Sequence, residues 1–197
     1  MKKSGILIFL SFVVSFPLFC QNKFSKNDIL NAKEIVVYGL DFSNTIIIHE
    51  SEKHVAIIEN DCYPAFNDRF FVKEFNDLKT VIKADLIGNA DFTRMLNLNR
   101  EKKYTIYDQT VISKIINEYK TPEKEGIGLV FIVKSFDKPN KCVELFPAFF
   151  DITTKKVIWT SEYTGTGGGH GLDTYWSEKL FDAIDDFIGS FKKKVGK

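Results

Sequence analysis

Apolar and β-branched residues gather in three runs in the second half of the chain, at 128–136, 142–153 and 156–164. Each run has the length and composition of a β-strand, and the first is apolar enough to lie at the centre of a sheet. The turn at 137–140 contains Pro139, and the turn at 154–155 is shorter still. Connections this short join antiparallel neighbours, so we predict a three-stranded meander.

Helical periodicity marks three other segments. Apolar residues recur at spacings of three and four over 172–195, which predicts a long C-terminal helix. A second amphipathic stretch covers 111–119, after Asp108 as the capping residue. A third covers 51–72 and is predicted to kink or split near Pro64, which cannot continue a helix undisturbed.

The hydrophobic patterns of the remaining segments are shorter and less distinct. Residues 34–42 predict a strand, and 46–48 either extend it or begin a helix. A short helix is expected around 78–86, before a turn at 88–89. The fold class is therefore α+β (mixed α/β): an antiparallel-rich sheet of about four to five strands, helices packed on it, and a long C-terminal helix. Residues 34–197 form a single domain after a polar leader at 21–33.

The N-terminus predicts export. Lys2 and Lys3 precede an apolar run at 5–19, which is shorter than the roughly 20 residues of a membrane-crossing helix. We interpret residues 1–20 as a signal peptide with cleavage after Cys20. The mature chain then has no transmembrane segment, and we expect an exported protein that is periplasmic, outer-membrane-associated or secreted. The alternative is a lipid anchor on Cys20, although the bulky Phe19 departs from the small residue that lipoprotein processing prefers.

Charge and composition exclude some partners. Loss of Lys2 and Lys3 takes the formal charge from +1 to −1. Nucleic-acid binding needs a clustered positive field, so we expect no nucleic-acid partner. The three histidines lack metal-ligand spacing, and we predict no metal and no cofactor. Cys62 and Cys142 form either a disulfide, as export permits, or two buried thiols.

The most unusual segment is glycine-rich and covers residues 164–173, hereafter the glycine segment. A P-loop is excluded because no lysine and hydroxyl residue follow its last glycine. One interpretation is structural, with glycines where the long helix packs closely. The other is a ligand or partner loop whose exposed amides bind an anionic small molecule or a protein. Its candidate residues are Gly165, Gly167, Gly168, Gly169, His170, Gly171, Asp173, Tyr175 and Trp176.

No coherent catalytic set is evident, and we predict no catalytic residue. The alternative is a periplasmic hydrolase that uses His170 with a carboxylate brought in by folding. Asp182, Asp185 and Asp186 lie on the last helix, where we interpret them as a solvated outer face.

The chain resembles uncharacterised secreted proteins of Bacteroidetes in residues 36–44 and 129–133, in the stretch from Phe149 to Trp159, and in the glycine segment with Tyr175 and Trp176. More distantly they are similar to envelope domains of the TolB N-terminal, curli-secretion lipoprotein and penicillin-binding-protein activator type. The resemblance implies a non-enzymatic role and transfers no catalytic residue. We therefore expect an exported cell-envelope module for binding or assembly, acting through an envelope protein partner.

Overall fold

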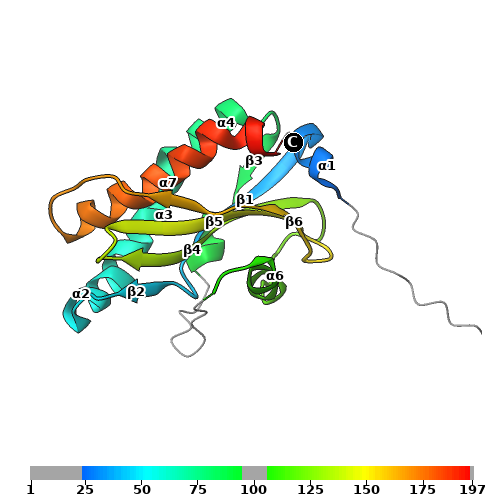
Figure 1. Ribbon diagram of the computed structural model, residues 1–197. Helices are drawn as coiled ribbons and strands as arrows, with labels where there is room; N and C mark the ends of the chain where they lie inside the picture. The colour runs from blue at the N-terminus through cyan, green and yellow to red at the C-terminus, as the bar shows by residue number, and fades with distance from the viewer. Residues whose placement is uncertain (1–23, 95–105, 196–197) are drawn as a thin grey trace, which may run out of the picture.

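The computed structural model describes residues 24–94 and 106–195, and Figure 1 shows the arrangement of its elements. The predicted signal peptide and Cys20 lie outside the described residues. Within those residues, no helix is both long enough and apolar enough to cross a membrane. The elements in chain order are α1 (Lys26–Asn31), β1 (Glu34–Asp41), β2 (Ile46–Ile48), α2 (Glu52–Ile57), the π-helical turn η1 (Ile58–Cys62), α3 (Tyr63–Val72), α4 (Glu74–Val81), β3 (Asp85–Gly88), α5 (Ala90–Arg94), α6 (Gln109–Asn117), β4 (Ile127–Asp137), β5 (Cys142–Asp151), β6 (Val157–Thr160), β7 (Tyr163–Gly165) and α7 (Leu172–Val195).

The sheet has seven strands, more than the four to five predicted. Its main order is β3-β1-β4-β5-β6, with β2 beside the far half of β4 and β7 beside β5. Strands β1 and β2 run parallel to β4, and β3 runs parallel to β1. The predicted number of strands was too low because β2, β3 and β7 have only three or four residues each. Strands this short show no clear alternation of apolar and polar positions.

The predicted meander is present in β4, β5 and the strands that follow. Strand β4 pairs antiparallel with β5 along nearly its whole length. The connecting turn is closed by Asp137, whose carboxylate accepts hydrogen bonds from the Asn140 backbone N–H at 2.9 Å and from its side-chain amide at 2.8 Å. The expected third strand is divided into β6 and β7, which pair with opposite ends of β5.

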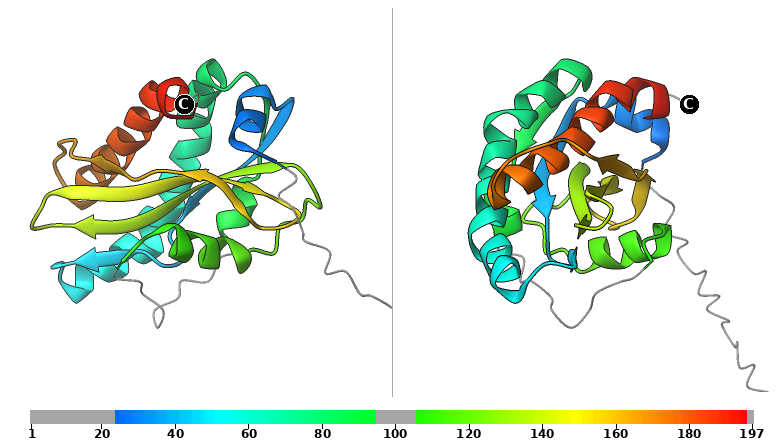
Figure 2. Two further views of the ribbon diagram at one scale, coloured as in Figure 1. Left: turned by 45° about the vertical axis from the view of Figure 1, so that its right-hand side comes forward. Right: turned by 60° about the vertical axis from the view of Figure 1, so that its left-hand side comes forward.

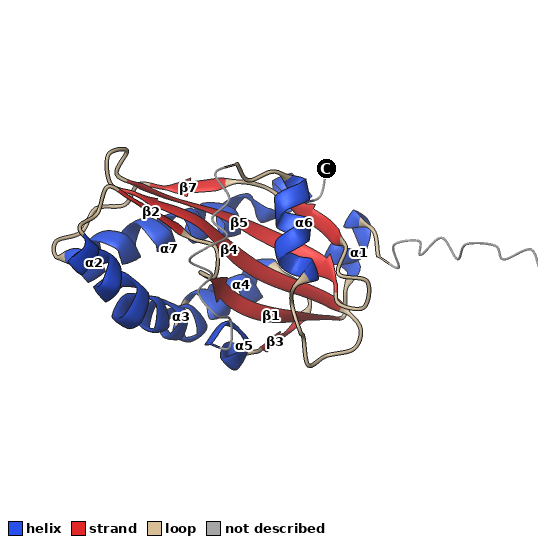
Figure 3. Ribbon diagram, turned by 90° about the horizontal axis from the view of Figure 1, so that it is seen from below, coloured by secondary structure: helices blue, strands red, loops and turns tan. Residues whose placement is uncertain are grey.

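Helices cover both faces of the sheet, as Figures 2 and 3 show. On one face, α3, α4 and α7 enclose the larger core, to which α7 contributes Leu180, Ile184 and Phe187. On the other face, α6 lies over β4 and β5 and packs Ile112 and Ile116 into a second core. Alternate residues of β4 enter the two cores because successive side chains of a strand point to opposite faces.

The broken helix follows from Pro64. Proline has no N–H to donate, and its ring clashes with the carbonyl four residues earlier. Here the helix widens into η1 just before Pro64 and resumes as α3, so the predicted interruption is confirmed. Asp108 caps α6 as expected, accepting from the Val111 N–H at 2.9 Å. The helix predicted around 78–86 is confirmed only in its first half. Helix α4 ends at Val81, and Leu86 lies in strand β3.

Candidate functional site

The glycine segment is packed against the backbone of α7. A Cβ atom added to Gly165 would lie 1.8 Å from the carbonyl oxygen of Lys179. One added to Gly167 would lie 2.6 Å from the carbonyl oxygen of Glu178, and one at Gly169 would lie 2.5 Å from that of Thr174. These three alternate glycines face the helix, as the structural interpretation of the segment predicts. Only a residue without a side chain permits so close an approach.

Two side chains of α7 bind the main chain of this segment. The carboxylate of Asp182 accepts hydrogen bonds from the N–H groups of Thr166, at 2.7 Å, and Gly167, at 3.1 Å. Lys179 is 3% exposed and donates to the carbonyl of Gly167 at 2.5 Å. The interpretation of Asp182 as part of a solvated face is therefore corrected. The amides that could cradle an external anion at this point already bind a carboxylate of the chain itself.

The other candidate residues of the segment separate into two groups. Gly168, His170 and Asp173 are exposed, and within the described ranges no hydrogen bond reaches the His170 ring. The geometry that the hydrolase alternative requires, His170 against a carboxylate and a nucleophile, is not present among those residues. Trp176 is buried against Phe136, with ring centroids 5.2 Å apart, so its place in a partner loop is corrected to a place in the core.

Gly171 and Tyr175 line an open cavity of about 300 Å³, which we name the groove. It lies where the start of α7 meets α2 and the turn between β4 and β5. The backbone of Gly171 has a φ of +83°, a left-handed conformation that glycine adopts without strain, and this bend turns the chain into α7. The lining residues are Glu50, His54, Lys138, Gly171, Leu172 and Tyr175.

One wall of the groove is charged and the other is apolar. The Glu50 carboxylate, whose side chain is only 2% exposed, lies 2.8 Å from Lys138 Nζ and 2.9 Å from His54 Nδ1. Burial disfavours its charge, but the contacts with Lys138 and His54 outweigh burial and hold the pKa of Glu50 below its usual value. Both partners remain nearly half exposed. Leu172 and Tyr175 are the apolar side chains of the lining, and we refer to them as the apolar wall.

Sequence reasoning missed Glu50 and Lys138. Lys138 was part of a hairpin turn, and Glu50 preceded Ser51, whose hydroxyl caps α2 by accepting from the His54 N–H. Neither position carries a signal of its own, because the two residues meet only when β2 lies along β4.

The two cysteines are buried free thiols in the structure. Cys62 belongs to the core under α7, and Val143 enters the same core. Since side chains alternate along a strand, Cys142 points to the opposite face from Val143. Of the two alternatives open from the sequence, the structure therefore contains the thiols and not the disulfide. Burial raises the pKa of Cys62 to about 11 and also raises the pKa of Cys142.

A second polar cluster lies at the end of β1 and serves the fold. Asp41 is 1% exposed and accepts a short hydrogen bond from the Tyr119 hydroxyl and another, at 2.8 Å, from the Ser43 N–H. Burial raises the pKa of Asp41, although both hydrogen bonds favour its charged form. The cluster fixes the segment after α6 against the sheet, because Tyr119 lies just beyond the end of α6.

Comparison with known proteins does not assign the chain to a family. No protein-family model matches it, and no curated protein matches it. Among solved structures, it is similar to the hypothetical protein CT253 from Chlamydia trachomatis, with a TM-score of 0.34 and 12% identity over 83% of this chain and 98% of that chain. A similarity at this level carries no argument about fold or function. The resemblance to secreted Bacteroidetes proteins stays a prediction.

Proposed function

We propose that the protein is an exported, non-catalytic binding module of the cell envelope, and that it holds a protein partner in the groove. The observation that carries the proposal is the meeting of three separate segments at this place: residues 50–54, the β4–β5 turn, and the continuous stretch from the end of the glycine segment into α7. All three contribute to one cavity of about 300 Å³. Concave sites with an apolar wall and a few placed polar groups are the common form of binding sites.

The chemistry of the lining favours an acidic and apolar peptide segment as the occupant. The Lys138 side chain remains nearly half exposed although its ammonium group pairs with Glu50. A carboxylate of the partner would contact this ammonium while an apolar side chain packs on Tyr175 and Leu172. Tyrosine is enriched at protein interfaces because its ring offers large contact area with a polar tip.

The glycine segment supports this site mechanically. Lys179 and Asp182 tie its main chain to α7, and the Lys179 ammonium also lies 4.3 Å from the centre of the Tyr175 ring. The apolar wall is thus attached to a rigid helix before a partner arrives. A wall already held in its binding geometry loses little conformational entropy on association.

Site-specific photo-cross-linking in intact cells tests the proposal. A photoreactive phenylalanine analogue at position 175 should give one discrete adduct in the envelope fraction. The same analogue at position 124, at the opposite end of β4 and exposed, serves as the control and should give none. Absence of an adduct at 175, or equal adducts at both positions, would contradict partner binding in the groove.

Export is tested separately by the mass of the mature N-terminus. A free N-terminus at Gln21 in the envelope fraction is the expected result, and an acylated Cys20 would establish the lipid-anchored alternative. Recovery of the full chain from the cytoplasm, with Met1 retained, would overturn export.

A further inference from the structure

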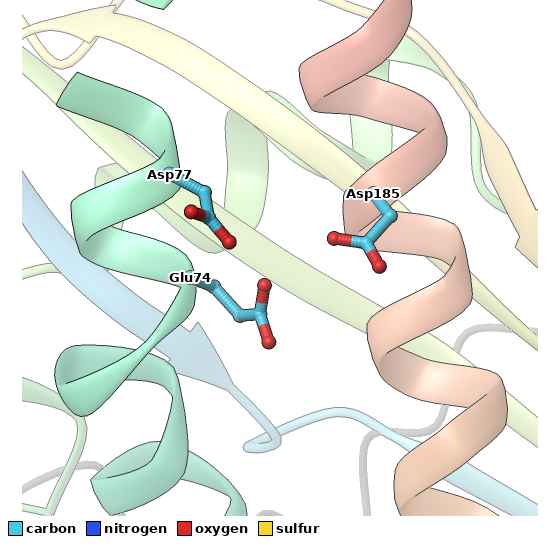
Figure 4. Close-up of side chains that lie close together, drawn as sticks. All are labelled: Glu74, Asp77 and Asp185. Carbon is cyan, nitrogen blue, oxygen red and sulfur yellow. The ribbon is translucent and has the colours of Figure 1, made fainter. Parts of the chain in front are cut away.

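Three carboxylates from two helices converge on the side of the sheet away from α6. Glu74 and Asp77 belong to α4, and Asp185 belongs to α7. One oxygen of each lies within 4.8 Å of the others, and Figure 4 shows the three side chains directed into the space between the helices. Asp185 is exposed, as the sequence predicts, and the packing of α4 on α7 brings it beside Asp77 and the buried Glu74.

Glu74 distinguishes this cluster from an ordinary acidic surface. Its residue is 0% exposed, and its Oε2 atom is buried without a hydrogen-bond partner among the described residues. The other oxygen, Oε1, accepts from Lys73 Nζ at 3.1 Å. A buried polar atom normally has a partner, because leaving it unsatisfied costs about 1–3 kcal/mol. Oε2 is thus an unsatisfied buried oxygen on a side chain that Figure 4 shows directed into the space between the two helices.

The charges of the cluster do not balance within the protein. Lys73 is the one cation in direct contact with it among the described residues, against three carboxylates, which leaves a formal charge of −2. The cluster also crosses the contact between α4 and α7, so repulsion acts directly on helix packing. Helix polarity accounts for acidic residues near the start of α4 but not for Asp185, which lies well inside α7.

We propose that Glu74, Asp77 and Asp185 bind a calcium ion that links α4 to α7. A set made only of carboxylate oxygens selects a hard cation and not zinc or copper. Oxygens within 4.8 Å of one another fit around Ca²⁺, whose ligands lie at ~2.3–2.6 Å and whose flexible coordination leaves room for water. Mg²⁺ demands a tighter octahedron and gives up its water reluctantly.

Calorimetric titration of the mature protein with CaCl₂ tests the site. We expect one ion per chain, with a dissociation constant in the range of about 0.1–1 mM that is typical of extracellular calcium modules. In excess Ca²⁺ the unfolding temperature should rise by roughly 3 °C or more relative to EDTA, since the ion binds only the folded chain. MgCl₂ at the same molar concentration should raise the unfolding temperature by less than half as much.

Two neighbouring aspartates of α7 give a matched pair of variants. Asp185→Asn removes a ligand and should abolish both the calcium heat and the thermal shift, while its stability in EDTA is equal to or above that of the unaltered protein because repulsion is relieved. Asp186→Asn removes the same charge from the next residue, which is also exposed but lies outside the cluster, and should leave both unchanged. The proposal is overturned if no heat appears up to 10 mM CaCl₂ (about ten times the expected constant) or if both variants bind alike. The groove plays no part in this test, so its failure leaves the proposed function standing.

Discussion

Replacement of Gly165 by alanine is the sharpest test of how the glycine segment is held. The new Cβ would lie 1.8 Å from the Lys179 carbonyl oxygen and 2.5 Å from the Ala183 backbone nitrogen. Ordinary contacts of this kind are about 3.4 Å or longer, given carbon contacts near 3.5–4.0 Å. The strand and helix must therefore separate by more than 1 Å, and no side-chain rotation can absorb the clash because both opposing atoms belong to the helix backbone.

The expected loss of stability follows from this displacement. Overpacking of a well-filled interior costs typically about 1–3 kcal/mol and sometimes more. A backbone-on-backbone clash lies at the upper end, so we expect Gly165→Ala to lose about 3 kcal/mol or more. For a domain of this size that corresponds to a fall in unfolding temperature of roughly 6–12 °C.

Urea unfolding followed by circular dichroism measures the effect. Gly168→Ala is the matched control, since a Cβ at Gly168 meets nothing within 4 Å. The free energy of unfolding of Gly168→Ala should lie within about 0.5 kcal/mol of that of the unaltered protein, or slightly above it because alanine restricts the unfolded chain. If the two variants lost equal stability, or if Gly165→Ala lost less than about 1 kcal/mol, the packing described for this segment would be refuted.

Three other predictions concern polar groups and thiols. Asp182→Ala leaves two loop amides without their acceptor and should cost about 1–3 kcal/mol, measured by the same urea titration. Tyr119→Phe removes a hydrogen bond to the buried Asp41 and should cost about 1.5–3 kcal/mol at neutral pH. Because the pKa of Asp41 is raised in the fold, its charge disappears at a higher pH than that of an ordinary carboxyl group, and this cost should shrink as the pH falls. Cys62 and Cys142 should react slowly with a thiol reagent at pH 8 in the native protein and rapidly once it is unfolded.

A specific result would contradict each of these three predictions. An Asp182→Ala variant as stable as the unaltered protein would mean that the loop amides bind something else. A cost of Tyr119→Phe that grows on acidification would reverse the sign expected from a raised pKa of Asp41. If Cys62 and Cys142 did not react with the thiol reagent in the unfolded protein until a reductant was added, the disulfide would be established.

The raised pKa of Cys62 gives a further prediction. Folding stability should fall as pH rises from about 9 towards 11, because the folded Cys62 resists ionisation to about pH 11.

Local sequence patterns were sufficient to predict the longest helix and the longest strands. The C-terminal helix runs over Leu172–Val195, as its apolar periodicity predicts, because a continuous stripe had a single face to bury. The hairpin of β4 and β5 was equally legible, since its turn residues and its apolar runs indicate the same structure. Agreement between short-range preference and the final fold is what makes such elements predictable.

The rest depends on contacts between distant segments. β3 has one buried residue, Leu86, and becomes a strand because β1 offers it a parallel edge. The groove likewise needs Glu50 and Lys138, which lie far apart in sequence and meet through the pairing of β2 with β4. Asp182 and Asp185 have similar local sequence, yet one binds the glycine segment and the other faces α4. No periodicity distinguishes them.

The most direct test of the account is the affinity of the mature protein for the partner that cross-links at position 175. Lys138→Gln removes the ammonium group of the groove, and Lys141→Gln removes the same charge from the same hairpin outside the groove. We expect Lys138→Gln to weaken binding by roughly tenfold, equivalent to 1.4 kcal/mol, and Lys141→Gln to change it less than about twofold. Equal affinities of the two variants would contradict binding of an acidic partner segment in the groove.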